Sequence, residues 1–509
     1  MANYTRSNAW NKGGTFANDD LLWYAKGVGI MQSRALNDPN SWWFFAAIHG
    51  EKISFTSGYP GWGFIPPVPI VPTSPLPPES DREIYWNQCQ HRSWFFLPWH
   101  RGYLIALEMQ VREAIIGLGG PATWALPYWD YLGPGDEYRI PPAFVQQKLP
   151  DGSANPLYVT ARYGPRSDGN IFVSIPPVSS VSMSNDIYTG SNLNTPWPGF
   201  GGPRTEFWHS GGLSGNLEEN PHNHVHVDVG GSSPDGRIGG LMSNPDLAAL
   251  DPIFYLHHCN IDRMWAVWNA DGNANPTSSS WLAGPAGMGE RKFIMPKPGA
   301  VPWVYTPADV NSLDTLDYIY ESATVQVTAI RRTFSKRMKQ LGVAMPEGVP
   351  MAIVEDIHNT SELVGAHDGA LRIDSSGVRA SVKLDNQVRN KMVSTLVTAS
   401  VINVPDRVYL QLENVRGTRD ANKLNIYVNG IAAGCVPLFG MHQASLKDGE
   451  HGGSGLMLQV EITDIIDTLH MENALDSDSL DVRIIPDRSI PKDSEISVGR
   501  ISIYREGRM

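Results

Sequence analysis

The sequence predicts an α+β protein in two successive parts, a mainly α-helical domain over residues 1–325 and an all-β sandwich over 365–509. In the first part, apolar residues recur at helical spacing, as in 99–117. In the second, short runs that alternate apolar and polar residues, such as 424–429, end at turn residues. At roughly 150 residues per domain, the 509 residues suffice for two large domains and a linker, here 326–364.

Helical signals recur at several places in the first part. One helix is predicted to begin at Asp38-Pro39, a capping residue followed by proline at the first helical position. Residues 132–215 are rich in Gly, Pro, Ser and Asn, which predicts an irregular insert, and a long insert of this kind often acts as a lid. The predicted helical segments are 16–49 in two pieces, 99–117, 221–229 and 251–270.

Composition excludes several classes of protein. The formal net charge of −12 disfavours general binding to nucleic acid or to a membrane surface. No apolar run reaches about 18 residues, so no transmembrane helix is expected. The 3 cysteines are too few for a disulfide scaffold. The polar N-terminus resembles no signal peptide, so the sequence predicts a cytoplasmic protein, with export by another route left open.

Histidines gather in two short motifs between residues 222 and 258. On a helix that begins at the preceding Asn-Pro pair, His222 and His226 are i, i+4 neighbours and can grip one metal ion. A solvated histidine cluster is the alternative. His257 and His258 are adjacent and point about 100° apart on a helix, so only one of them can join the same metal, and helical geometry does not say which.

Three further histidines precede these motifs. Pro98 separates His91, predicted on a loop, from His100, predicted at the start of a helix, so that both can point inward. His49 closes the preceding aromatic helix. Together the histidines predict a buried metal site, and imidazole ligands suit Cu, Zn, Fe or Ni. Without bridging carboxylates, two coppers fit such a site better than two zincs.

The segments around these histidines resemble the copper-binding signatures of type 3 copper proteins, that is tyrosinases, catechol oxidases and haemocyanins. The tail resembles the C-terminal β-domain of the long forms. The resemblance implies a four-helix bundle that holds two copper ions. The matching segments are Cys89–Glu108, Glu218–Val227, Asp251–Trp265 and the Tyr318-Ile319-Tyr320 motif that ends the domain.

The resemblance also implies roles for individual residues. It selects His258 over His257, links Cys89 to His91 by a thioether bond in place of a free thiol, and pairs Asp262 with Arg263. The implied ligands are His49, His91 and His100 for the first copper and His222, His226 and His258 for the second.

The implied activity is oxidation of small phenols by O2, with ortho-hydroxylation of monophenols and conversion of o-diphenols to o-quinones. Glu218 and Asn223 would hold a water that accepts the phenol proton, and Glu219 competes with Glu218 for that role. The pocket would be lined by Val227, Pro245 and Phe254. The alternatives are a catechol or o-aminophenol oxidase without monophenolase activity, and a haemocyanin-like O2 binder.

The C-terminal domain of such proteins can block the active site. The loop that holds Leu438, Phe439 and Met441 is the predicted plug, and an ordinary apolar loop is the alternative. The sequence leaves the oligomeric state open, including a homo-oligomer.

Overall fold

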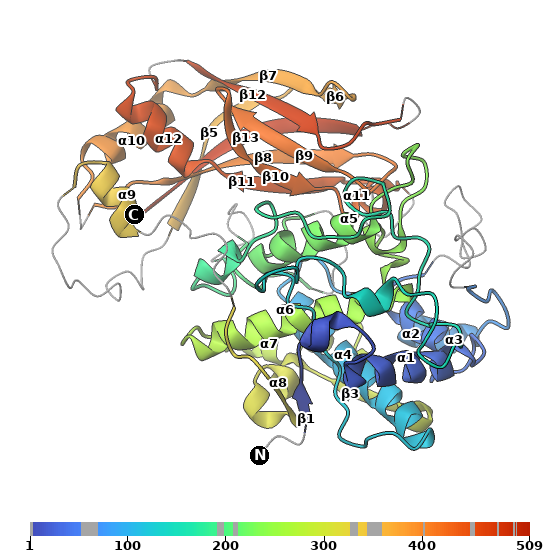
Figure 1. The fold of residues 1–509 in the computed structure, drawn as a ribbon. Helices are drawn as coiled ribbons and strands as arrows, with labels where there is room; N and C mark the ends of the chain where they lie inside the picture. The colour runs from blue at the N-terminus through green and yellow to red at the C-terminus, as the bar shows by residue number, and fades with distance from the viewer. Residues whose placement is uncertain are drawn as a thin grey trace.

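The computed structural model consists of a helical domain and a sheet domain that lies against it (Figure 1). Among the described residues, no helix is long and apolar enough to cross a membrane. The structure describes residues 4–51, 70–190, 198–206, 212–325, 334–343, 359–400, 403–447, 453–475, 478–491, 494 and 496–508.

The helices of this domain occur in the predicted order, but the helix that ends at His49 and the helix that carries His100 begin at other residues than predicted. The Ser41 side chain accepts a hydrogen bond from the amide of Phe44, so the second helix begins after Ser41 and not at Asp38-Pro39. Pro98 lies in the first turn of α4, where a missing amide hydrogen costs no helical bond. The helices are α1 (Asp19–Gln32), α2 (Trp42–His49), α3 (Glu79–Tyr85), α4 (Phe96–Gly117), α5 (His224–Gly230), α6 (Ile253–Ala270), α7 (Ser279–Leu282) and α8 (Pro307–Val310).

Short strands join distant parts of this domain. The parallel pair β1 and β4 brings the N-terminus against the Tyr318-Ile319-Tyr320 motif, and β2 and β3 form a hairpin. The described part of the insert 132–215 is irregular apart from two short 3₁₀ turns, and its apolar side chains join the core of the domain. The strands are β1 (Tyr4–Arg6), β2 (Phe293–Lys297), β3 (Val301–Tyr305) and β4 (Tyr318–Tyr320).

The C-terminal strands form one nine-stranded sheet, so the α+β class is confirmed. A sandwich of two sheets was expected, but here the end strands β10 and β11 approach each other and the single sheet curls toward a barrel. The strands are β5 (Asn359–His367), β6 (Leu371–Ile373), β7 (Val378–Leu384), β8 (Arg407–Arg416), β9 (Lys423–Val428), β10 (Ile431–Pro437), β11 (Leu456–Glu461), β12 (Ser479–Pro486) and β13 (Ile496–Arg508).

Helices cover the ends of this sheet, and one of them lies in the predicted linker. Arg337 of that helix, α9, forms a buried ion pair with Asp467 of α12, so this part of the linker packs on the sheet domain. Most of the remaining linker lies outside the described residues. The helices are α9 (Phe334–Gln340), α10 (Asn386–Val397), α11 (Met441–Ser445) and α12 (Thr463–Met471).

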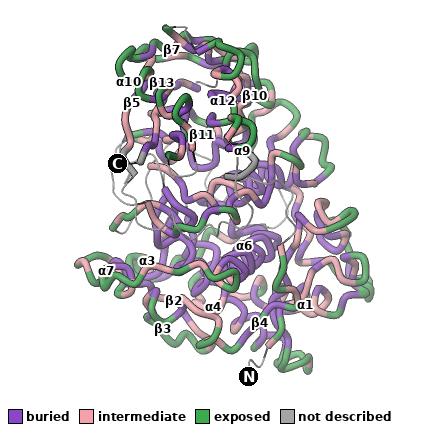
Figure 2. The backbone as a smooth tube through the Cα atoms, turned by 90° about the vertical axis from the view of Figure 1, so that its left-hand side faces the viewer, coloured by how far each residue is buried: buried purple, intermediate pink, exposed green. Residues whose placement is uncertain are grey.

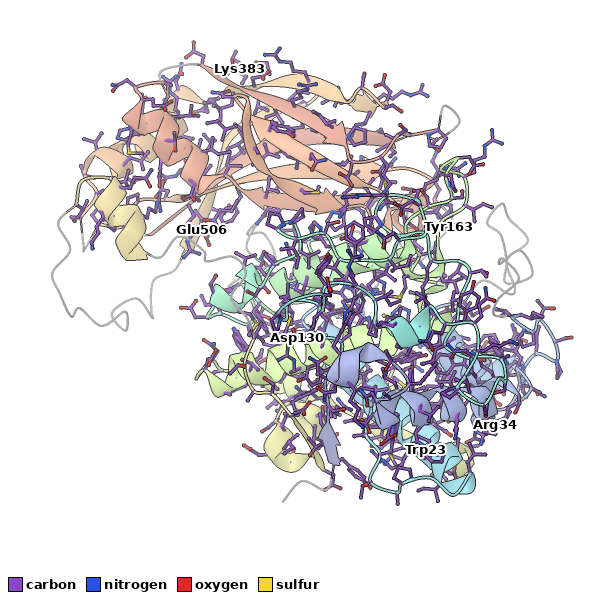
Figure 3. The ribbon with its side chains drawn as sticks, in the orientation of Figure 1. Trp23, Arg34, Asp130, Tyr163, Lys383 and Glu506 are labelled. Carbon is purple, nitrogen blue, oxygen red and sulfur yellow. The ribbon has the colours of Figure 1, made fainter. Side chains whose placement is uncertain are left out.

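Each domain has its own apolar core, and polar contacts join the two. Figure 2 shows α6 buried along most of its length in the helical domain. Lys423 of β9 forms a buried ion pair of 2.5 Å with Asp228 of α5, and Arg488 donates to the carbonyl of Val227. These contacts place the sheet domain over α5, whereas Lys383 lies on the far side of the sheet (Figure 3).

Candidate metal centre

The first histidine group combines three segments of the helical domain. His49 ends α2, His91 lies in the loop before α4, and His100 lies near the start of α4. The centroids of their rings lie 5.4 to 5.7 Å apart. Their ring nitrogens and the Cys89 sulfur lie within 4.8 Å of one another, close enough to share one metal ion.

The second group comes from the turn before α5, from α5 and from α6. Asn220 has non-helical backbone angles, so His222 lies in a π-helical turn, Glu218–Asn223, and α5 begins after it. The Nε2 atom of His258 lies 3.2 Å from that of His222 and 3.3 Å from that of His226. His257 also belongs to this cluster, but its ring packs on Tyr131. His258, by contrast, stacks on His100 of the first group with ring centroids 4.4 Å apart.

Hydrogen bonds orient these rings for metal binding. The Nδ1 atoms of His49, His100 and His226 donate to the carbonyls of Pro245, Phe96 and Met242 at 2.8 to 2.9 Å. Each Nδ1 therefore carries the proton, which leaves the Nε2 lone pair free for a metal. Among the described residues, the buried Nε2 of His49 has no hydrogen-bond partner. The donor set thus fits metal ions at both groups.

Burial keeps the histidines neutral, as metal ligands must be. It lowers the pKa of His49 from 6.5 to about 3. It also lowers the pKa of His258 well below the ordinary value, with a further contribution from the neighbouring histidines. A cluster of neutral imidazoles suits copper.

Two aromatic rings lie between the groups. The Phe254 ring lies 4.1 Å from His258 and 4.8 Å from His49, centroid to centroid. Phe96, which sequence reasoning missed, lies 4.6 Å from His100 and 4.8 Å from His222. The sequence signal that could have identified Phe96 is its position four residues before His100, on the same face of the helix. Both rings limit the movement of histidines from both groups.

Known proteins match both domains. Residues 39–271 match the common central domain of tyrosinase, and residues 360–506 match a domain of unknown function. The chain is 32% identical to tyrosinase HcTyr1 of Hahella sp. over 99% of both chains. It is 31% identical to the latent form of a polyphenol oxidase from Prunus armeniaca over 38% of this chain and 32% of that protein. The chain belongs to the tyrosinase family.

The fold agrees with this membership. The structure of latent apple tyrosinase aligns with 98% of this chain and 97% of its own, with a TM-score of 0.55 at 19% identity. As a member of the tyrosinase family, the protein is an oxidoreductase that oxidises phenols with O2 at a dinuclear copper site.

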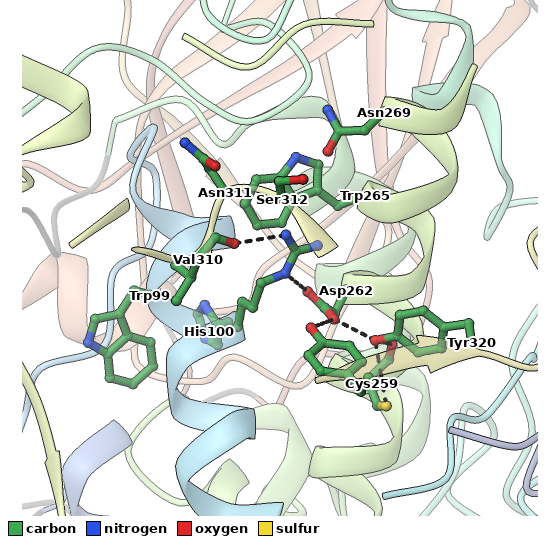
Figure 4. Close-up of polar contacts among 12 residues, drawn as sticks. Trp99, His100, Cys259, Asp262, Trp265, Asn269, Val310, Asn311, Ser312 and Tyr320 are labelled. Atoms are coloured by element: carbon green, nitrogen blue, oxygen red, sulfur yellow. Dashed lines mark hydrogen bonds and ion pairs between the residues drawn. The ribbon is translucent and has the colours of Figure 1, made fainter. Parts of the chain in front are cut away.

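An ion-pair network between α4 and α6 supports this tyrosinase-family centre. Asp262 receives hydrogen bonds from Arg101 at 2.5 Å, from Tyr318 at 2.7 Å and from Tyr320 at 2.5 Å (Figure 4). Burial opposes ionisation of Asp262, but Arg101 and Arg6 outweigh it and hold the pKa below the ordinary value. The expected pair of Asp262 with Arg263 is wrong, because Arg263 pairs with Asp130 at 2.8 Å.

The two glutamates before His222 have different partners. Both oxygens of Glu218 accept from the amide of Arg92, at 2.9 and 3.0 Å, whereas Glu219 accepts from the Asn223 side chain at 3.3 Å. Burial raises the pKa of Glu218 to about 8 and that of Glu219 to about 7. Asn223 also binds Nδ1 of His222 through its side-chain oxygen at 2.9 Å. The structure therefore brings Asn223 to Glu219, and Glu218 to the residue beside His91.

Phe439 of the sheet domain reaches the histidines. Its ring stacks on His226 with centroids 4.3 Å apart and an angle of 22°, and it meets His91 and His222 edge to face. Leu438 and Met441 instead lie in the core of the sheet domain. They anchor the loop, while Phe439 alone enters the centre.

The other two predicted pocket residues, Pro245 and Val227, both lie against the sheet domain. Pro245 accepts the Nδ1 proton of His49, and its ring lies next to Gly440. Val227 is buried and contacts Arg488 of the sheet domain through its carbonyl.

Proposed function

We propose that this chain both hydroxylates monophenols and oxidises o-diphenols to o-quinones. Copper bound at each group would supply one-electron redox chemistry, and two such ions would together supply the two electrons for O2. The convergence of the Nε2 atoms of His222, His226 and His258 supports the second ligand set. The proposed ligands of the first copper are His49, His91 and His100. Their ring nitrogens lie within 4.8 Å of one another, which favours this set.

Monophenol hydroxylation needs an acceptor for the phenol proton, whose pKa is about 10. Glu218 is the proposed acceptor, acting through a water, because its carboxylate lies against the residue beside His91 and is near Cys89. Asn223, which orients the ring of His222 and binds Glu219, is proposed to hold the same water. A positioned base of this kind contributes about 10²- to 10⁴-fold in rate.

The full-length chain is proposed to be latent, and Phe439 is the proposed plug. The ring of Phe439 stacks on His226, a proposed ligand of the second copper, and would exclude a phenol ring from that position. Pro245 packs beside Gly440, the next residue of this loop. Access to copper therefore requires this loop to move.

Cys89 is the proposed partner of a thioether bond to His91. Its sulfur lies 3.5 Å from Nδ1 of His91 and also 3.4 Å from Nε2 of His100. A covalent link would fix the orientation of the His91 ring. Peptide mass spectrometry of the copper-loaded protein should give a linked Cys89–His91 peptide lighter by about two hydrogens, and an alkylatable thiol at Cys89 would exclude the bond.

Oxygen uptake tests the activity. The copper-loaded chain and its Phe439→Gly variant are assayed in parallel with tyrosine, catechol and o-aminophenol. We expect uptake with tyrosine as well as with catechol. Uptake with catechol alone would exclude the monophenolase, a preference for o-aminophenol would identify the alternative oxidase, and reversible O2 binding without turnover would indicate a haemocyanin-like carrier.

A further inference from the structure

Arg92 holds the backbone of the residue that fills the centre. Its Nη2 atom donates to the carbonyl oxygen of Phe439 at 3.0 Å, while the ring of Phe439 stacks on His226. The same arginine is buried and follows the proposed ligand His91 in the chain. Phe439 is therefore bound at two points, by its ring and by its carbonyl oxygen.

These two points define the outline of a small molecule. A phenylalanine residue contains an aromatic ring, two carbons and a carbonyl carbon, which is the skeleton of a 3-arylpropanoate. The carbonyl oxygen of Phe439 occupies the position of one carboxylate oxygen of such an acid. Because the guanidinium group is a planar fork of donors, it binds a carboxylate more strongly than it binds a neutral carbonyl.

Arg92 interacts electrostatically with Glu218 and Glu219 of the helical domain, and also with two groups of the sheet domain. Phe439 and Asp420, which also interacts electrostatically with Arg92, both belong to that domain. Among the described residues, the buried Nε of Arg92 has no hydrogen-bond partner. When the loop moves away, the guanidinium loses the carbonyl of Phe439 as its hydrogen-bond acceptor.

The backbone at Arg92 is fixed by contacts within the helical domain. Arg92 has a φ of +54°, a left-handed conformation that is uncommon for residues other than glycine. Its amide is fixed by both oxygens of Glu218. The backbone that carries the arginine side chain is thus held independently of the sheet domain.

We propose that Arg92 is a specificity-determining residue that binds the carboxylate of 3-arylpropanoate phenols, a substrate class that Phe439 imitates in the latent chain. This inference rests on the proposed function of the same site. It assigns the ring to the histidines and the acid group to Arg92.

The test compares two o-diphenols that differ only in charge, 3-(3,4-dihydroxyphenyl)propanoate and its primary amide. The full-length, copper-loaded chain carries Phe439→Gly, which removes the ring that stacks on His226. In this background, Arg92→Asn removes the charge with a residue that tolerates positive φ, and Arg92→Lys keeps it. We expect Arg92→Asn to lower the acid-to-amide ratio of kcat/KM about tenfold, which equals about 1.4 kcal/mol, mainly through KM, with partial retention by Arg92→Lys.

A binding measurement and a control variant make the result decisive. Calorimetry with 3-phenylpropanoate, which lacks a hydroxyl group and is not oxidised, should show the same loss of affinity in Arg92→Asn. Arg419→Gln is the matched control, because Arg419 also donates to carbonyls across the domain interface, at Gly236 and Arg237, and should leave the ratio unchanged. An unchanged ratio and affinity in Arg92→Asn would overturn the inference, whereas absence of catechol oxidation in every variant would instead reject the proposed function.

Discussion

The two histidine groups offer similar rings to a metal but differ in what surrounds them. His49, His91 and His100 come from separate segments and are enclosed by the helical domain alone, apart from one edge of His91. The second group lies within 36 residues of sequence, from His222 to His258. Its helix α5 carries the ion pair with Lys423, and its His226 carries the Phe439 ring. The sheet domain therefore contacts the metal centre mainly through the second group.

The largest expected effect tests the assignment of the second group. Replacing His258 by alanine removes the ring whose Nε2 meets those of His222 and His226, so oxidation of catechol should be lost together with one of the pair of copper ions. His257→Gln is the matched control and should lower activity by about 10- to 100-fold at most, as for residues that only support a ligand. Copper analysis and oxygen uptake measure both. The reverse pattern would assign His257 as the ligand.

The next largest effect separates the two glutamates between the groups. Glu218→Gln should lower tyrosine hydroxylation by about 10²- to 10⁴-fold while catechol oxidation is retained, because catechol needs no such strong proton acceptor. Glu219→Gln keeps the hydrogen bond to Asn223 and should change the ratio of the two rates much less. Equal effects on tyrosine and catechol would make Glu218 a structural residue.

The ion pair between Lys423 and Asp228 of α5 tests whether docking of the sheet domain limits catechol oxidation. Lys423→Met leaves Asp228 buried without its cation and should weaken domain docking by about 3–5 kcal/mol. Thermal unfolding should then separate into two transitions, and catechol oxidation by the full chain should rise. The control Arg379→Met breaks an exposed pair with Asp481 and should change neither measurement. A rise in catechol oxidation in Arg379→Met alone would contradict the proposed coupling between the sheet domain and the metal centre.

The smallest effect concerns the plug itself. Phe439→Gly opens the space above His226 and should raise catechol oxidation by the full chain at least about tenfold, a change of ~1.4 kcal/mol. Phe439→Leu retains apolar bulk and should stay latent. Initial rates of oxygen uptake compare the two variants. Equal rates would show that the ring does not limit access.

Local signals in the sequence predicted most of the helical domain. The aromatic run before His49, the helix around His100 and the helix that holds His257-His258 all follow from periodicity and capping, since these properties depend on neighbouring residues. The irregular turn at Asn220 escaped this reasoning, because the Asn-Pro pair also occurs as a helix start. The single curled sheet escaped it as well, since alternation predicts strands but not their partners.

By itself, the sequence predicted which residues carry the chemistry: six histidines in motifs of fixed spacing, a cysteine two residues before one of them, and an acidic pair before another. Only the tertiary structure decided which groups meet across long separations. Arg92 and the Phe439 carbonyl are 347 residues apart, and Asp262 takes Arg101 rather than its neighbour Arg263. Adjacent residues on a helix point in different directions, whereas packing brings distant ones into contact.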